Sequence, residues 1–139
     1  MSIVHLDRVQ WEWLKHYYIE MLTAVEKTQV DKRERGFFIV QNGDKIARSH
    51  TQVGTESRVI LKMKTLPDEL LTSNDKLMSF HTHNGSLDSP SAIDRKTAVA
   101  LGGEYTVIGY FDKGKPHIKV WSISQRWDYR IRRKLVFTF

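Results

Sequence analysis

Residues 76–101, KLMSFHTHNGSLDSPSAIDRKTAVAL, contain a predicted strand, a loop and a predicted helix in succession. The strand covers 76–83 and ends at two histidines, and the loop after it contains Gly85 and Pro90, which favour turns. The helix covers 91–101, since Gly102 and Gly103 form a natural stop. This stretch therefore predicts a sheet that packs against at least one helix.

The sequence on either side adds one earlier helix and several strands. Strands are predicted over 36–40 and 45–51, joined by the turn signal Asn42-Gly43, and over 57–64, with a short helical turn at 66–71. Two further strands, 104–111 and 116–123, form a hairpin across 112–115, and the alternation at 135–139 allows a last strand. A helix is predicted over 9–27, ended by the charged stretch 27–35; its apolar stripe is Leu14, Tyr18, Met21, Leu22 and Val25.

This order of elements predicts one α/β (α+β) domain over 1–139, with a mixed or antiparallel sheet flanked by helices. A chain of 139 residues can bury its own core, and 40% hydrophobic with 27% charged residues is typical of globular proteins. The chain has no cysteine. That excludes disulfides, a thiol nucleophile and a cysteine-rich zinc finger, so a bound metal must use His, Asp or Glu.

The net charge of +6 and the pI of 9.6 indicate an acidic partner, protein or nucleic acid. Much of the excess lies within 126–134, where a solvated basic segment is an equally good interpretation. No apolar run approaches the roughly 20 residues that span a bilayer, and the first residues do not resemble a signal peptide. The sequence thus predicts a cytoplasmic protein without membrane association, and leaves open whether it forms a homodimer.

The segment 81–94 brings together side chains that are suited to binding a metal. His81 and His83 lie two residues apart on a predicted strand, so they point to the same face, and the following helix returns Asp94 towards them. Two imidazole nitrogens and a carboxylate oxygen are ligands that Zn²⁺ accepts, with a fourth position left for water as in catalytic sites. Ser91 and Asp94 also fit a variant of the capping box, which is the structural alternative for that pair.

The pattern H-x-H-x₇-S-x-x-D, formed by His81, His83, Ser91 and Asp94, resembles the signature of the JAMM (MPN⁺, Mov34/JAB) zinc metalloproteases. Their pattern includes a glutamate just before a strand, and Glu34 ahead of 36–40 matches it. The alternative for Glu34 is a solvated charge between two arginines. Departures are two: Asn84 stands where many members have proline, and Thr82 where serine is common. The resemblance covers most of the chain and implies a compact, prokaryote-type MPN/JAB-like domain with a cytidine-deaminase-like arrangement.

The resemblance also implies roles. His81, His83 and Asp94 would hold Zn²⁺, Glu34 would carry the proton of the activated water to the leaving amine, and Ser91 would stabilise the oxyanion. The implied substrate is the bond after the C-terminal glycine of a ubiquitin-like modifier or sulfur-carrier protein. A non-catalytic MPN scaffold or binding module is one alternative. A RadC-like nucleic-acid-associated protein is another, although no helix-turn-helix, zinc finger or RNA-binding signature supports it.

Overall fold

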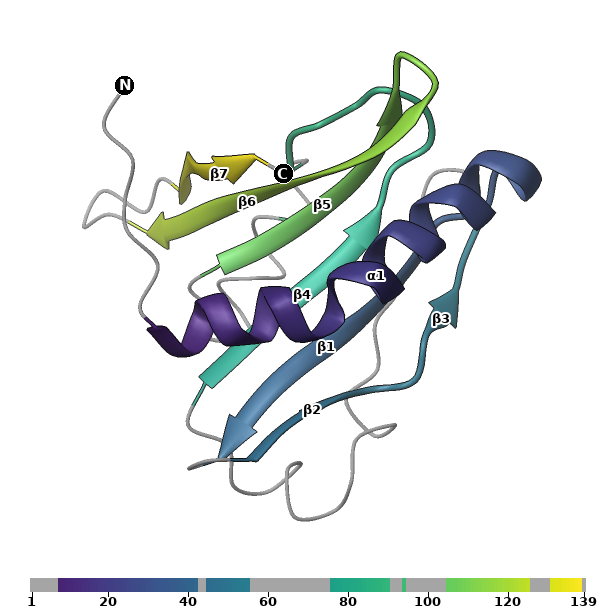
Figure 1. The fold of residues 1–139 in the computed structure, drawn as a ribbon. Coiled ribbons are helices and arrows are strands. Elements are labelled where there is room, and N and C mark those ends of the chain that lie inside the picture. Colours follow the sequence, from purple (N-terminus) through teal and green to yellow (C-terminus); the bar gives the residue numbers. More distant parts are fainter. Residues whose placement is uncertain are drawn as a thin grey trace.

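A computed structural model of the chain describes residues 8–42, 45–55, 76–90, 94, 105–125 and 131–138. Figure 1 shows a long helix lying across a twisted sheet. In chain order the elements are α1 (Arg8–Asp31), β1 (Arg35–Asn42), β2 (Lys45–Arg48), β3 (Gln52–Val53), β4 (Lys76–Thr82), β5 (Tyr105–Asp112), β6 (Lys115–Gln125) and β7 (Ile131–Thr138). No helix among the described residues is both long and apolar enough to cross a membrane.

The seven strands form one mixed sheet in the order β2-β1-β4-β5-β6-β7, with β3 also pairing with β1. All the pairings are antiparallel except that of β4 with β5. Two parallel neighbours need a crossover connection, and residues 83–104 provide it. Asp94 lies within this connection and is helical. The architecture confirms the α+β class that the sequence predicts.

Helix α1 buries one side on the sheet. Met21 and Val25, two members of the predicted stripe, are 0% and 1% exposed, whereas Tyr18 and Leu22 are only partly buried. Tyr17 and Ala24 are buried in their place, so the stripe is centred slightly to one side of the predicted line. The sheet residues that complete this core are Phe37, Ile39, Met78, Phe80, Val107, Ile118 and Val120.

The close contact between α1 and β5 depends on a glycine. A Cβ atom built on Gly109 would lie 2.5 Å from the Val25 Cγ2 and 3.1 Å from the Phe80 ring. Because Val25 and Phe80 are themselves fully packed, neither can move away cheaply. The absent side chain at position 109 therefore sets the distance between the helix and the centre of the sheet.

Alternation along β4 gives the sheet two faces of different composition. Met78 and Phe80 point towards α1 and join the core, so Ser79 and His81 point to the opposite face. On that face the Ser79 and Thr106 hydroxyls are 3.0 Å apart and hydrogen-bonded. Phe38, Val40 and Ile108 are buried on this side as well. We call it the polar face of the sheet because it also carries these polar groups, and the side that contacts α1 the helix face.

Most of the predicted elements that can be compared with the structure are confirmed, including the last strand, β7. The hairpin between β5 and β6 turns at Lys113 and Gly114, with φ angles of 51° and 76°. The predicted end of the first helix is wrong: α1 continues through the charged residues to Asp31, because buried Thr28 adds a further turn of contact with the sheet. The predicted strand 57–64, the turn 66–71 and all of the helix 91–101 except Asp94 lie outside the described residues.

Candidate metal centre

Strand β4 presents two histidines at its carboxyl end. His81 lies in the strand on the polar face, and His83 follows directly after the strand. The His83 backbone N–H donates to the carbonyl of Gly109 at 2.8 Å, which extends the pairing of β4 with β5 past the last residue of β4. Both imidazoles are buried, with 7% and 5% of their residue surfaces exposed. Two rigid strands thus fix the position of both rings.

The helical residue Asp94 brings a carboxylate to the same point. Its Oδ2 atom lies 3.0 Å from the Nε2 of His81 and 3.1 Å from the Nε2 of His83. The two Nε2 atoms are 3.0 Å apart. The three residues therefore form a nearly equilateral triangle of ligand atoms, and they are a group that could hold a metal ion.

The hydrogen bonding of His83 tests whether these residues suit a metal. Its Nδ1 lies 3.1 Å from the backbone carbonyl of Leu87, which can only accept, so Nδ1 carries the hydrogen. A neutral His83 then directs the lone pair of Nε2 towards the Asp94 carboxylate, which is also an acceptor. Acceptors this close repel one another unless a cation or a proton lies among them. A neutral ring with its second nitrogen bound to a carbonyl is the usual arrangement of a metal-ligating histidine.

The spacing of the three atoms also suits a small cation. With bonds of about 2.0–2.1 Å, two ligands of a tetrahedral zinc lie roughly 3.3 Å apart. The observed separations of 3.0–3.1 Å need only a small adjustment to reach that value. The donor set, two imidazoles and one carboxylate, therefore fits a divalent metal ion in both chemistry and size.

Protons compete with a metal for this position. Burial lowers the pKa of His83, but the hydrogen bond and charge of Asp94, with smaller effects of Glu34 and Leu87, outweigh it and leave the pKa raised. In the absence of a metal, protonation of His83 relieves the crowding of acceptors. A metal that binds here must displace the proton of His83, so we expect metal affinity to weaken as the pH falls.

Glu34 lies beside the two histidines because of the pairing of β1 with β4. In that antiparallel ladder Gly36 faces His81, and continuing the register by two residues brings Glu34 opposite His83. The backbone of Glu34 is held on its other side, where its N–H donates to the carbonyl of Thr55 and its carbonyl accepts from Gly54, both at 2.8 Å. Glu34 is thus fixed by hydrogen bonds on the strand end next to the site.

The environment of the Glu34 side chain suits a group that exchanges protons near neutral pH. Burial raises the pKa of its carboxyl to about 7, an effect that the charge of His83 opposes and that of Asp94 reinforces. The residue is only 7% exposed, and within the described part of the chain no hydrogen bond reaches its carboxylate. A bound cation at the three ligands would lower this pKa and favour the carboxylate.

The two arginines on either side of Glu34 point elsewhere. Arg35 makes a two-point ion pair with Asp31 of α1, in which one N–O distance is 2.7 Å, and Arg33 donates from Nε to the carbonyl of Gly54. The alternative in which Glu34 is a solvated charge between two arginines is wrong, since the residue is only 7% exposed. Burial of Glu34 on the polar face leaves it close to His83 and Asp94 instead.

The loop after His83 is tied to the end of α1. The Asn84 side chain donates from Nδ2 to the carbonyl of Lys32 at 2.7 Å, and Lys32 has a left-handed backbone with φ of 62°. The segment from Lys32 to Glu34 is therefore held next to the segment His83-Asn84. Asn84 stands out in the sequence only as a departure from proline, which does not indicate this contact.

The structure brings together four of the five predicted site residues, Glu34, His81, His83 and Asp94. Ser91 lies outside the described residues, so its predicted contact with an oxyanion and its alternative role as a helix cap both stay predictions. The carbonyl of Leu87, which determines the tautomer of His83, was missed because a backbone group has no signature in a sequence. A scan against protein-family models and a search of curated proteins found no match to this chain.

Proposed function

We propose that this chain is a zinc-dependent hydrolase of the JAMM type that cleaves a peptide or isopeptide bond. The observation that carries the proposal is the triangle of His81, His83 and Asp94 with a buried glutamate beside it. A metal site alone fits many proteins. A buried carboxyl group next to that site, with no hydrogen-bond partner in the described part of the chain, is what hydrolysis by activated water needs in addition.

In this proposal His81, His83 and Asp94 would hold a zinc ion, which would supply a polarised water and a Lewis acid for the scissile carbonyl. The Glu34 carboxylate accepts one proton from the attacking water and donates it to the departing amine, so that the amide and water become a carboxylic acid and an amine. Burial of Glu34 keeps bulk water from supplying the proton instead. His83 keeps Nδ1–H on the Leu87 carbonyl throughout, and Ser91 donates a hydrogen bond to the oxyanion.

The proposed substrate is a ubiquitin-like modifier or sulfur-carrier protein, cleaved after its C-terminal glycine. This choice rests on the resemblance of the H-x-H-x₇-S-x-x-D pattern and Glu34 to the JAMM signature. A protein substrate is also consistent with the basic composition, since an acidic partner would be attracted to a chain of net charge +6. A cytoplasmic location belongs to the same proposal, because the chain has no cysteine from which a disulfide-stapled secreted scaffold could be built.

The test compares purified wild type, loaded with Zn²⁺, with Glu34→Gln on a ubiquitin-like protein fused or isopeptide-linked to a reporter. We expect cleavage by the wild type and a loss of at least about 100-fold in Glu34→Gln, with one zinc per chain retained in both. Glu26→Gln is the matched control, since Glu26 lies on the exposed side of α1 and should retain full activity. Full zinc occupancy without any cleavage would instead favour a non-catalytic binding module.

A further inference from the structure

The loop that follows the two histidines lies along strands β5 and β6. Beyond the bond from His83 to Gly109, the Phe111 N–H donates to the carbonyl of Gly85 at 2.9 Å. The loop therefore follows β5 for several residues before it turns away. Its next contacts are made by β6, the strand beyond β5, on the polar face.

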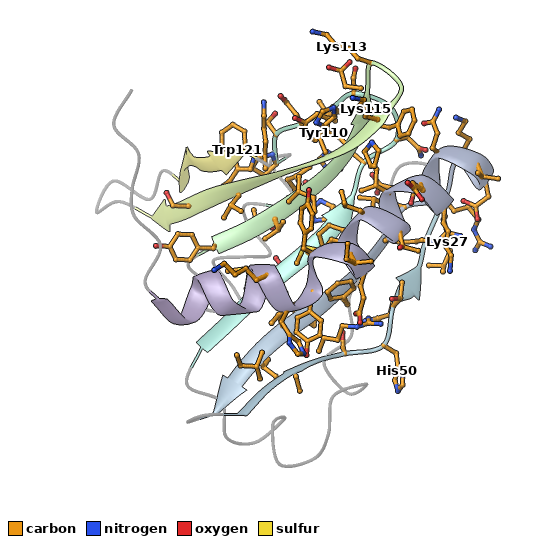
Figure 2. All side chains as sticks on the ribbon, in the orientation of Figure 1. Lys27, His50, Tyr110, Lys113, Lys115 and Trp121 are labelled. Atoms are coloured by element: carbon orange, nitrogen blue, oxygen red, sulfur yellow. The ribbon has the colours of Figure 1, made fainter. Side chains whose placement is uncertain are left out.

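Asp88 is the residue through which β6 holds the loop. Its carboxylate forms an ion pair with the Lys119 Nζ, and its backbone carbonyl accepts a hydrogen bond from the Trp121 indole Nε1 at 3.0 Å. The flanking residues Ile118 and Val120 are fully buried on the helix face, so Lys119 and Trp121 point to the polar face. In Figure 2 Trp121 lies along β6, while Lys113 and Lys115 lie at the hairpin tip.

Leu87, the residue immediately before Asp88, determines the tautomer of His83. Leu87 exposes 56% of its surface to solvent, and in the described part of the chain its carbonyl is the acceptor for His83 Nδ1. Nothing about the exposed Leu87 side chain explains why this carbonyl stays in place. Its position follows from Asp88, which is fixed at both its side chain and its carbonyl.

We propose that Lys119 and Trp121 are positioning residues for the metal centre: by fixing Asp88 they hold the Leu87 carbonyl on His83 and keep its Nε2 free as a ligand. The inference rests on the metal centre of the proposed function. If the loop is released, His83 can take the other tautomer, with the hydrogen on Nε2 directed at Asp94, and the position for a metal is then blocked.

The test measures metal affinity, by competition with a chelator, in wild type, Lys119→Met and Trp121→Phe. Trp121→Phe removes the indole N–H and keeps an aromatic ring. We expect each substitution to weaken Zn²⁺ binding about tenfold, at the lower end of the effect of groups that orient a ligating histidine. Lys119→Arg should restore affinity, since it can pair with Asp88. Lys115→Met, which removes an exposed cation from the same strand, is the matched control and should bind as the wild type does.

Two spectroscopic readouts separate positioning from a general loss of structure. The visible spectrum of the Co²⁺-substituted protein should change in Lys119→Met and Trp121→Phe but not in Lys115→Met. Long-range ¹H–¹⁵N spectra of the metal-free protein at alkaline pH should show the hydrogen of His83 on Nδ1 in wild type and on both nitrogens in the two variants. Should Lys119→Met fail to fold, Asp88→Asn breaks the same ion pair and leaves the carbonyl for Trp121 in place.

The outcomes distinguish this inference from the proposed function. If wild type binds no metal, the metal centre is wrong and the positioning role is overturned with it. If wild type binds Zn²⁺, and Trp121→Phe and Lys119→Met match it in affinity, cobalt spectrum and His83 tautomer, only the positioning role is overturned.

Discussion

The two faces of the sheet differ in composition although they alternate along the same strands. On the helix face Phe37, Met78 and Phe80 are fully buried among the apolar side chains of α1. The polar face also buries apolar side chains, those of Phe38, Val40 and Ile108, but only there are they accompanied by the buried ionisable groups of His81 and Glu34. Burial of ionisable groups costs stability, which the apolar helix face offsets. A strand period of two thus places Phe80 in the apolar core and its neighbour His81 in the candidate metal centre.

The largest difference in stability is expected between variants of two neighbours on β4. Phe80→Ala should lower the free energy of unfolding by about 3–5 kcal/mol, because it leaves a cavity in the core. His81→Ala should lower it by about 1 kcal/mol or less in metal-free protein, since it relieves a crowding of acceptors. The second variant, not the first, should lose stoichiometric zinc. Urea denaturation in EDTA measures the free energy of unfolding, and metal analysis measures the zinc content. Equal losses of stability in the two variants would contradict the different contributions of the two faces to stability.

The next effect concerns the cost of burying Glu34. Because its pKa is raised from 4.5 to about 7 in the folded protein, the folded state binds this proton more tightly than the unfolded state. The stability contributed by the protonated form is fully present below pH 4.5 and is lost as the pH rises to about 7. Glu34→Gln, which has no such proton, should therefore be more stable than wild type at pH 8 by about 3 kcal/mol.

This prediction is checked by thermal and urea unfolding of both proteins at pH 4 and pH 8 with the metal removed. Zinc must be absent because a bound cation lowers the Glu34 pKa and hides the effect. An equal stability difference at both pH values would show that Glu34 is not perturbed in this way. Combined with a loss of cleavage, extra stability at high pH in Glu34→Gln marks a residue retained for chemistry at a cost in stability.

A smaller effect links the two faces. Gly109→Ala should lower the free energy of unfolding by about 1–3 kcal/mol, because its Cβ would press on Val25 and Phe80. The Gly109 carbonyl also accepts the His83 N–H, so the same change should weaken zinc binding by a few-fold. Calorimetry and chelator competition measure the two losses. A loss of stability with unchanged zinc affinity would mean that the helix face does not influence the metal centre.

Much of this architecture could be predicted from the sequence because local signals were strong. The apolar stripe of α1, the two-residue turn at Lys113-Gly114 and the alternation along β4 each depend on neighbouring residues alone. The proximity of His81 and His83 could be predicted for the same reason, since they share a face whenever their segment is a strand. Glu34 could be predicted only from the resemblance to the JAMM pattern; its position beside His83 depends on the pairing of β1 with β4, which no local signal in the sequence indicates.

The parts that could not be predicted depend on contacts between distant segments. The end of α1 at Asp31 is fixed by Thr28 against Thr82 and by the ion pair with Arg35, and these partners are set by the fold. The contacts of Lys119 and Trp121 with Asp88 likewise join positions more than thirty residues apart. A lysine or tryptophan in a strand gives no indication of which loop it will reach.

Thr82, the residue that separates the two histidines, links the metal centre to the helix. Its hydroxyl lies 2.8 Å from that of Thr28 on α1 and accepts the backbone N–H of Arg35 at 2.8 Å. The peptide that carries both ligands is therefore anchored to the helix and to the strand behind Glu34 by one oxygen atom. A sideways displacement of α1 would pull on the two histidines and on Glu34 together, so their mutual geometry is protected from thermal motion of the helix.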